Sequence, residues 1–229
     1  MKHSFLYLLT FLPFSLFVSC TQDNYDKGEG EYSLMRADFV EAHVGSDKRI
    51  DYIVTDDGDS LATEPRFTTR SIETADTTYR VILYYNKVKN DAGHDVAEAK
   101  GMSIVPTLSA HSSSQTLHHL SPKTDPVKFE SIWTARNLRY VNVSILLMTG
   151  TPDDDDAMQS ISLINEGIRD NADGSHTARY RLGHDQGGVP EYYSQQCYFS
   201  IPVRKLKADS LRLVLQTYDG EVSKTVSLK

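Results

Sequence analysis

The sequence lacks the short motifs that usually identify an enzyme. Neither a Gly-x-Ser-x-Gly nucleophile elbow, nor a glycine-rich phosphate loop, nor a His-Glu-x-x-His zinc motif occurs in its 229 residues. These motifs hold a nucleophile, a phosphate or a metal through fixed spacing along the chain, so sites of those kinds are excluded. A site assembled from distant Ser, His and Asp residues is the enzymatic arrangement that stays open.

Clusters of basic residues are also lacking. The chain has 24 Lys and Arg residues against 31 Asp and Glu, a formal net charge of −7, and the basic residues are scattered. A nucleic-acid-binding surface or a polybasic membrane-binding segment would concentrate positive charge in one place. We therefore expect no nucleic-acid partner.

Long apolar runs are confined to the start of the chain. Lys2 and His3 precede an apolar run from Phe5 to Val18. This run is shorter than the roughly 20 residues that a helix needs to cross a membrane. A basic start followed by a short apolar run is typical of a secretory signal peptide, predicted here at residues 1–19.

Cysteine occurs only twice, and Cys20 follows this signal directly. Val18-Ser19-Cys20, with Phe17 where leucine is usual, resembles the lipobox of bacterial lipoproteins, in which the cysteine is acylated and becomes the new N-terminus. Cys20 is then the lipidation site, and its acyl chains anchor the protein to the membrane. The alternative is an ordinary signal peptide followed by an incidental cysteine.

The stretch after Cys20 has no aliphatic side chain. Residues 21–31 include four acids and two glycines, too little apolar surface to fold. We therefore expect residues 20–35 to be the lipidated cysteine and a flexible tether. Acid-rich tethers here resemble the signal by which some anaerobic Gram-negative bacteria send lipoproteins to the outer face. The expected location is the cell envelope, lipid-anchored in the outer membrane, at its periplasmic face or on the cell surface.

With Cys20 acylated, Cys197 has no partner for a disulfide. An exported chain of about 210 residues must then rely on its hydrophobic core. Cys197 alternates with Phe199, Ile201 and Val203 on one face of a predicted strand. This position favours a buried, inert thiol over a nucleophile.

Alternating apolar and polar residues predict half-buried strands over most of the remaining chain. Ile50, Tyr52 and Val54 are expected to share one strand face. In later strands the residues expected to share a face are Val141, Val143, Ile145 and Leu147; Leu211, Leu213 and Leu215; and Val222, Lys224, Val226 and Leu228. The segment YRVILYYNKV at 79–88 is apolar on both faces, as is typical of a central strand.

Turn residues separate these strands. Asp-Gly or Gly-Gly pairs occur at 57–58, 173–174, 187–188 and 219–220, and the last indicates a hairpin. No sustained helical period follows the signal. The predicted fold class is therefore all-β.

A polar stretch rich in Ser, Thr, His and Pro at residues 109–126 divides the chain. The part before it has the four or five strands of a small barrel, and the part after it has the seven or so short strands of a sandwich. We predict a barrel domain at 36–110, a linker at 111–125 and a β-sandwich domain at 126–229.

The order of these features resembles the NigD-like lipoproteins, a family named after a gene in a bacteriocin operon. A lipoprotein signal and an acidic tether precede one strand-rich module with IDYIVTDDGDSL and YRVILYYNKV. A second module carries NLRYVNVSILLMTG and LRLVLQTYDGEVSKTVSLK. The resemblance covers nearly the whole mature chain and implies an N-terminal OB-like barrel followed by a C-terminal β-sandwich. It implies no enzymatic activity.

Three Asp-Ser or Asp-Thr pairs resemble the acceptor motif for O-glycosylation of exported proteins in bacteria of this kind. Their hydroxyl residues are Ser60, Thr77 and Ser210, each at an expected loop-to-strand edge. The alternative is turn chemistry, because Asp and Ser also hydrogen-bond to nearby backbone.

Metal-binding patterns are weak. The acidic run 153–156 lacks the alternate spacing of an EF-hand loop and is more typical of a solvated turn. His111, His118 and His119 lie in the predicted linker, and His176 and His184 flank a predicted hairpin across which they could meet. Neither group has the pattern of a zinc site, so we predict no metal and no cofactor.

Tyrosines are the remaining candidates for a binding surface. OB-like barrels bind sugars or oligonucleotides on one face, and Tyr52, Tyr84, Tyr85, Tyr192 and Tyr193 could form a stacking platform. Strand tyrosines also serve as core residues and cross-strand pairs.

These features predict a cell-envelope lipoprotein that is not an enzyme and acts as a binding or accessory module. Its partners are expected to be the membrane, through the lipid anchor, and an unknown protein or glycan. The alternatives are an exported hydrolase with a dispersed site and, from the family's name alone, a bacteriocin-associated self-protection protein.

Overall fold

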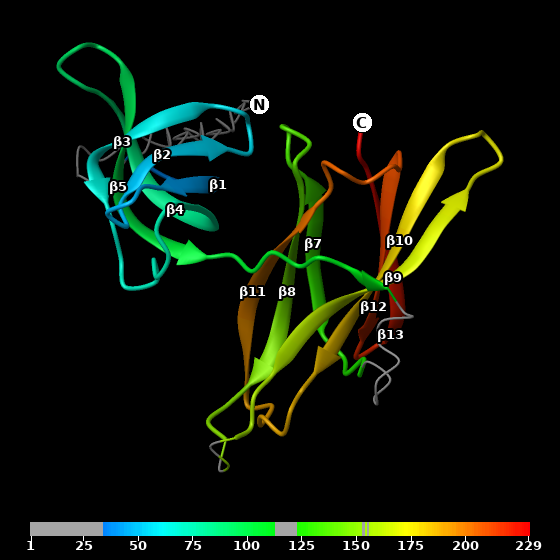
Figure 1. Cartoon of the computed structure of the whole chain (residues 1–229). Helices are drawn as coiled ribbons and strands as arrows, with labels where there is room; N and C mark the ends of the chain where they lie inside the picture. The colour runs from blue at the N-terminus through cyan, green and yellow to red at the C-terminus, as the bar shows by residue number, and fades with distance from the viewer. Residues whose placement is uncertain (1–33, 113–122, 153, 155) are drawn as a thin grey trace, which may run out of the picture. The chain divides into compact units, whose positions relative to one another are not determined.

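The computed structural model of the chain describes residues 34–112, 123–152, 154 and 156–229 (Figure 1). Residues 34–229 belong to one compact unit. The described residues form strands and no helix, so the predicted all-β class is confirmed. The predicted signal peptide, Cys20 and nearly all of the predicted tether lie outside the described residues, as do residues 113–122 of the predicted linker.

Five strands close into a barrel. They are β1 (Met35–Val44), β2 (Ile50–Thr55), β3 (Ser60–Phe67), β4 (Thr77–Lys89) and β5 (Asp95–Ile104), in the order β1-β2-β3-β5-β4. β4 pairs with both β5 and β1 and so closes the barrel. β3 and β5 are parallel neighbours, and the other pairs are antiparallel. The small barrel implied by the family resemblance is confirmed.

A bulge reverses the predicted face of β2. In the ladder with β1, Ile50 pairs with Val44 and Tyr52 with His43, which leaves Asp51 as an extra residue. The ladder with β3 also changes register between Ile50 and Tyr52. One extra residue moves every later side chain to the opposite face. Ile50 and Ile53 are therefore buried in the barrel, whereas Tyr52 is 41% exposed. The prediction that Ile50, Tyr52 and Val54 share a face was wrong, because alternation in a sequence does not reveal a bulge.

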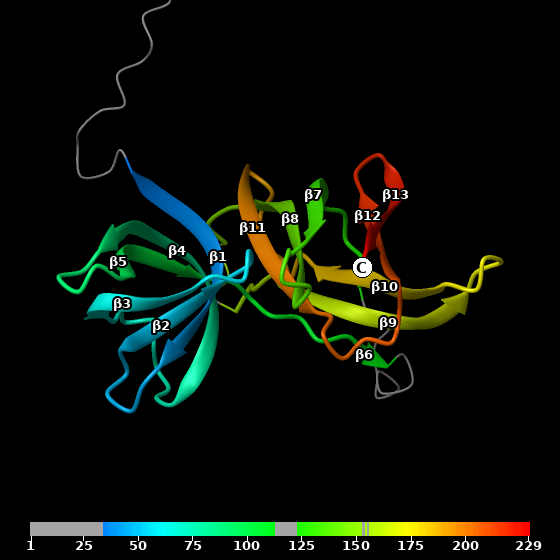
Figure 2. The same cartoon turned by 90° about the horizontal axis from the view of Figure 1, so that it is seen from above.

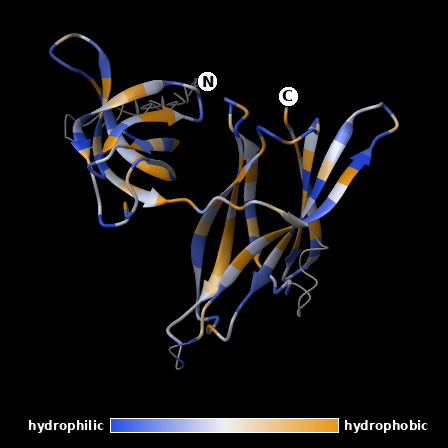
Figure 3. Cartoon of the chain, in the orientation of Figure 1, coloured by the Kyte–Doolittle hydropathy of each residue, from blue (hydrophilic) through white to orange (hydrophobic). Residues whose placement is uncertain are grey.

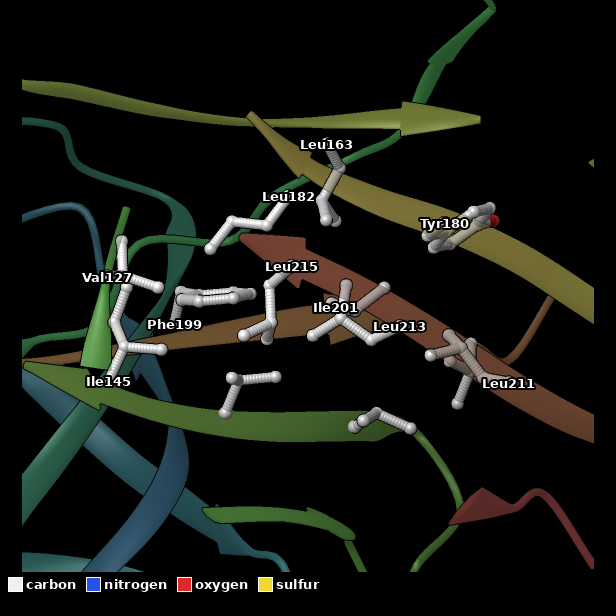
Figure 4. Packing of buried hydrophobic residues seen from close by; sticks show 13 residues of the cluster. Val127, Ile145, Leu163, Tyr180, Leu182, Phe199, Ile201, Leu211, Leu213 and Leu215 are labelled. Atoms are coloured by element: carbon white, nitrogen blue, oxygen red, sulfur yellow. The ribbon is translucent and has the colours of Figure 1, made fainter. Parts of the chain in front are cut away.

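The rest of the described chain forms a β-sandwich. Its strands are β6 (His111–Ser112), β7 (Lys128–Thr134), β8 (Tyr140–Thr149), β9 (Ser160–Asp170), β10 (His176–Asp185), β11 (Tyr193–Pro202), β12 (Ser210–Thr217) and β13 (Gly220–Ser227). One sheet has the order β13-β12-β10-β9-β6 and the other β11-β8-β7. Figure 4 shows side chains of both sheets, such as Leu182 and Phe199, packed into one core.

The predicted core faces of the sandwich strands are confirmed, except that Lys224, which was predicted to share the β13 face, is exposed. Val141, Val143, Ile145, Leu211, Leu213 and Leu215 are fully buried, and Leu147, Val222, Val226 and Leu228 pack against the same core. The alternation is visible as bands of hydrophobic and hydrophilic colour along the strands (Figure 3). The predicted hairpin at 219–220 joins β12 to β13, and Gly220 has a φ of 116°, which glycine adopts without steric cost.

Both ends of the predicted linker pair with the larger sheet of the sandwich. β6 runs parallel to β9 and lies beside it in both views (Figures 1 and 2). The Asp125 backbone N–H donates to the His184 carbonyl oxygen at 2.9 Å. These pairings attach the residues on either side of the undescribed segment to the sandwich.

Candidate functional site

Polar residues on the outer face of the β11-β8-β7 sheet are buried. Asn142 and Ser200 have no exposed surface, and Ser144 is 2% exposed, although they alternate with core residues. On a sheet with one solvated face these positions would be exposed. Arg80 on β4 contacts both Asn142 and Ser200, Asp56 after β2 contacts Asn142, and residues 106–108 pair with Ser200, which accounts for their burial.

Arg80 on β4 is the centre of these contacts. Its Nη2 lies 2.7 Å from Asp56 Oδ2 and donates to Asn142 Oδ1 at 3.0 Å, while its Nε donates to Ser200 Oγ at 3.1 Å. The guanidinium carbon lies 4.2 Å from the centroid of the Tyr140 ring, a cation–π contact. A buried charge is tolerated only when it is paired and hydrogen-bonded. Arg80 therefore fixes β4 against β8 and β11.

β1 adds a second contact with the sandwich. Glu41 accepts hydrogen bonds from Arg139 and from the Tyr140 hydroxyl, the latter at 2.9 Å. Burial, reinforced by Glu41, raises the pKa of Tyr140 to about 12, so its hydroxyl stays a donor at neutral pH. The Phe39 ring meets the Tyr198 ring edge to face at 5.5 Å. Charge, hydrogen bonds and aromatic packing all hold this face together.

A cleft of about 490 Å³ lies beside these contacts. Residues of β4, β5, β8 and β11 line it, together with Val105, Pro106 and Gln159. The lining residues on these strands are Ile82, Tyr84, Ser103, Ile104, Leu147, Gln195, Gln196, Cys197 and Tyr198. Among the residues that the structure describes, those lining the cleft include no charged side chain. Its volume is typical of a ligand pocket. Apolar walls with amides and hydroxyls suit an uncharged ligand.

Cys197 is the one thiol among the described residues that line the cleft. It packs against the sandwich core, on the face predicted from the sequence. Burial raises the pKa of the Cys197 thiol, which keeps the thiol protonated at neutral pH. Since the thiolate is the reactive form, this environment favours an inert cysteine.

The structure describes three of the four predicted modification sites. Cys20 lies outside the described residues. Ser60, Thr77 and Ser210 are the first residues of β3, β4 and β12, at the loop-to-strand edges that the sequence indicated. Ser60 is exposed, whereas Thr77 and Ser210 are half-buried. The Ser210 hydroxyl is also engaged with the Thr177 hydroxyl at 2.9 Å. Ser60 is therefore the most accessible of the three.

The two later histidines do not meet across a hairpin. His176 begins β10 and His184 lies near its end, so along one extended strand they are about 27 Å apart. His184 is 1% exposed, and His176 lies at the surface within 3.5 Å of Asp209. That prediction was wrong because the strand extends through both residues. The other metal candidates His118, His119, Asp153 and Asp155 lie outside the described residues.

No group of three or more His, Cys, Asp or Glu side chains that could hold a metal ion occurs in the described ranges. The same part of the chain contains no helix that is long and apolar enough to span a membrane.

The five candidate tyrosines do not form one platform. Tyr85 is fully buried in the barrel core, and its neighbour Tyr84 faces the cleft from the outside of β4. Tyr52 lies on β2 of the barrel, whereas Tyr192, just before β11, and Tyr193, its first residue, are exposed. Alternation along β4 separates adjacent tyrosines onto opposite faces.

Sequence reasoning missed the cleft itself. Its residues come from separate segments of the chain, and none belongs to a recognisable motif. The available signal was the second apolar face of β4, where Ile82 and Tyr84 alternate with the core residues. Apolar residues on both faces of a strand indicate that both faces are covered.

Comparison with known proteins shows the fold. No protein-family model and no curated protein matches the sequence. A NigD-like immunity protein from Bacteroides caccae has a similar structure, with a TM-score of 0.65 and 21% identity over 82% of this chain and 91% of that chain. A protein of unknown function from Bacteroides vulgatus gives a TM-score of 0.60 and 16% identity, over 84% and 90% of the two chains. A predicted lipoprotein from Bacteroides fragilis gives 0.57 and 9%, over 85% and 98%. The chain thus has the barrel-and-sandwich fold of the NigD-like immunity protein, as the resemblance in its sequence implied.

Proposed function

We propose that this chain is a NigD-like lipoprotein of the cell envelope that binds an uncharged ligand in the cleft and catalyses no reaction. The uncharged cleft of about 490 Å³ carries the binding proposal. The lipobox-like sequence at Cys20 and the similarity to a predicted lipoprotein support the envelope location. Self-protection against a bacteriocin, suggested by the name of the NigD-like family alone, would be one use of such a module; the similar protein from Bacteroides caccae is called an immunity protein.

The chemistry of the cleft supports binding over catalysis. A hydrolase needs a nucleophile, a base and a group that stabilises the transition state within hydrogen-bond reach. A glycosidase needs two carboxylates roughly 5–10 Å apart. The described lining residues offer hydroxyls, amides and one thiol with a raised pKa, but neither a carboxylate nor a histidine.

Binding can be tested with the soluble form, residues 21–229, titrated by calorimetry with neutral oligosaccharides and with uncharged peptides. Ile104, 43% exposed, lines the cleft, so Ile104→Trp should fill it and weaken binding at least tenfold. Ile168 is 51% exposed on β9 and does not line the cleft, which makes Ile168→Trp the matched control. Binding should change little between 0.05 and 0.5 M salt, because no charge pair is involved.

Two results would overturn this proposal. One is equal affinity of the wild type and Ile104→Trp for every probe that binds. The other is turnover in an assay against glycans, esters and peptides that Ile104→Trp abolishes and Ile168→Trp preserves.

The lipid anchor has its own test. If Cys20 is acylated, the full-length protein partitions into the detergent phase and incorporates labelled palmitate. Cys20→Ala should stay unprocessed or appear in the soluble fraction. Unchanged detergent partitioning of Cys20→Ala would contradict the anchor.

We also propose that Ser60 is the preferred acceptor if the chain is O-glycosylated, because its side chain is exposed at the start of β3. Intact-mass measurement of protein from its own host should show a glycan that Ser60→Ala removes. Ser210→Ala is the control, since the Ser210 hydroxyl is engaged with Thr177. Loss of the added mass in Ser210→Ala and not in Ser60→Ala would contradict this preference.

A further inference from the structure

The edge of β11 that faces away from β8 is paired over only part of its length. β11 is an outer strand of its sheet, and β8 pairs with one edge of it from Tyr193 to Pro202. On the other edge, the Ser200 N–H donates to the Pro106 carbonyl, and the Leu108 N–H donates to the Ser200 carbonyl, both at 2.9 Å. Residues 106–108 therefore act as a short strand added to β11 beside Ser200.

The pattern of an antiparallel ladder shows which other backbone groups face this edge. In such a ladder, successive residues direct their N–H and C=O groups alternately to the two neighbouring strands. Because Ser200 directs both groups toward residues 106–108, Tyr198 and Gln196 direct theirs to the same side. Within the described residues neither has a backbone partner there, and the Tyr198 carbonyl has only a long contact of 4.0 Å from the Cys197 thiol. Unpaired groups along a sheet edge are a template for another strand.

This unpaired part of the edge lies in the cleft. Gln196 and Tyr198 both line it, and Pro106 lines its end where the added strand begins. Ile82 and Tyr84 of β4 form one wall, while Leu147 and Cys197 on the core faces of β8 and β11 form another. An extended segment placed on the edge would direct alternate side chains toward these two walls.

We propose that the cleft receives an extended, uncharged peptide segment of a partner protein, which adds as a strand to β11 beside Gln196 and Tyr198. This rests on the proposed function, in which the cleft binds an uncharged ligand. The added strand at residues 106–108 shows that this edge accepts a strand in the fold itself. The described lining has no charge to pair with an acidic or basic segment, so the added strand is uncharged. Backbone hydrogen bonds supply affinity in this mode, and the walls supply selectivity for side chains.

Two substitutions of Gln196 separate the contribution of its backbone N–H to peptide binding from that of its side chain. Gln196→Pro removes the outward N–H without removing a hydrogen bond to β8, and proline is tolerated where a strand's N–H faces away from its partner. Gln196→Ala keeps that N–H but removes the side-chain hydrogen bonds to Glu130 and Ser144. Seven-residue peptides without Asp, Glu, Lys or Arg, selected by display on residues 21–229, are the probes. Gln196→Pro should weaken their binding at least tenfold, and Gln196→Ala less than threefold.

Circular dichroism shows whether Gln196→Pro folds. If it does not, measurements on the wild-type protein test strand addition instead. N-methylation of the selected peptide at alternate positions should abolish its binding, and N-methylation at the positions between them should be tolerated.

Hydrogen exchange reports on the protein itself. The amides of Gln196 and Tyr198 should exchange fast in the free protein and at least tenfold more slowly with bound peptide, whereas those of Gln195 and Cys197 should exchange slowly in both states.

The outcomes distinguish strand addition from binding in general. Peptides that bind Gln196→Pro as they bind the wild type, or that tolerate N-methylation everywhere, would overturn strand addition and leave the cleft as a binding site. Binding of neutral oligosaccharides that Ile104→Trp blocks, without binding of any peptide, would do the same. Failure of every probe to bind would overturn both proposals.

Discussion

The two sheets of the sandwich have the same alternating sequence pattern but different surroundings on their outer faces. On β13, the outward residues Ser223 and Thr225 are exposed, whereas on β8 the outward residues Asn142 and Ser144 are buried. Alternation predicts the face that meets the core, because the core excludes polar groups without partners. It does not predict what covers the opposite face. A polar outer face becomes a buried contact when its groups find hydrogen-bond partners, as Asn142 does with Arg80.

The largest expected effect comes from removing the charge at the centre of the buried face. Arg80→Ala leaves the largely buried Asp56 carboxylate without its charged partner and should lower the free energy of unfolding by about 3–5 kcal/mol. Urea denaturation of residues 21–229 measures this. Arg80→Met combined with Asp56→Asn removes both charges and should recover part of the loss. A loss below about 1 kcal/mol for Arg80→Ala would show that the pair behaves as an exposed one.

A somewhat smaller effect is expected in the core that both sheets share. Leu213 on β12 is fully buried among residues of both sheets. Leu213→Ala should lower the free energy of unfolding by about 3 kcal/mol, through lost apolar burial and the cavity left behind. Ile168→Ala on β9, where the side chain is 51% exposed, is the control and should change it by less than about 0.5 kcal/mol. Equal effects of the two variants would mean that the β12 side chains are not packed as described.

Substitution of one outward polar residue on β8 and one on β13 tests most directly whether the outer faces of the two sheets differ. Asn142 accepts from Arg80 and Ser200 and donates to Asp56 at 2.7 Å, so Asn142→Ala removes three hydrogen bonds from a buried network and leaves the Ser200 hydroxyl without its acceptor. The expected loss is about 1–3 kcal/mol. Ser223→Ala, at an outward position on the exposed face of β13, should cost less than about 0.5 kcal/mol. Similar small losses for both would indicate that the outer face of β8 is solvated in solution.

The sequence predicted much of the fold and little of the cleft, for physical reasons. Burial of apolar side chains imposes a local period on each strand, so the core faces of β8, β12 and β13 were predictable. The bulge at Asp51 was not, because it is fixed by the geometry of two ladders. Asn142 gave no sign of burial, since its partner Arg80 lies on a distant strand. The edge of β11 was equally hidden, because pairing depends on backbone groups that every residue carries.

The cleft depends on contact between strands that are far apart in sequence. Tyr84 and Tyr198 line it from β4 and β11, and Arg80 holds these strands in place through Ser200. Local patterns indicate that the outside of β4 is covered, but they do not identify the partner. Binding at the cleft should therefore fail in Arg80→Ala even where the barrel and the sandwich core remain folded.

The smallest expected effect lies at the rim of the larger sheet, where a carboxylate is partly exposed to solvent. Asp209 Oδ2 accepts from the His176 backbone N–H at 2.7 Å, and Lys229 Nζ lies 2.6 Å from Oδ1. The hydrogen bond from Lys229, followed by that from the His176 backbone, lowers the pKa of Asp209 from its ordinary value of 3.8 to about 2. A carboxylate with a lowered pKa in the folded state stabilises the fold above its unfolded pKa.

That stabilisation is lost as the pH falls from about 4 to about 2, because protonation removes the charge that Lys229 and the His176 N–H bind. Asp209→Asn should therefore lower the melting temperature slightly at pH 7, and the difference from the wild type should shrink to nothing as the pH approaches 2. High salt should reduce it at pH 7, since the pair with Lys229 lies at the surface. Lys229→Ala should reproduce part of the shift, because it removes the first of the two interactions. A melting-temperature difference that stays constant from pH 7 to pH 2 would show that Asp209 acts through packing at the start of β12 and not through its charge.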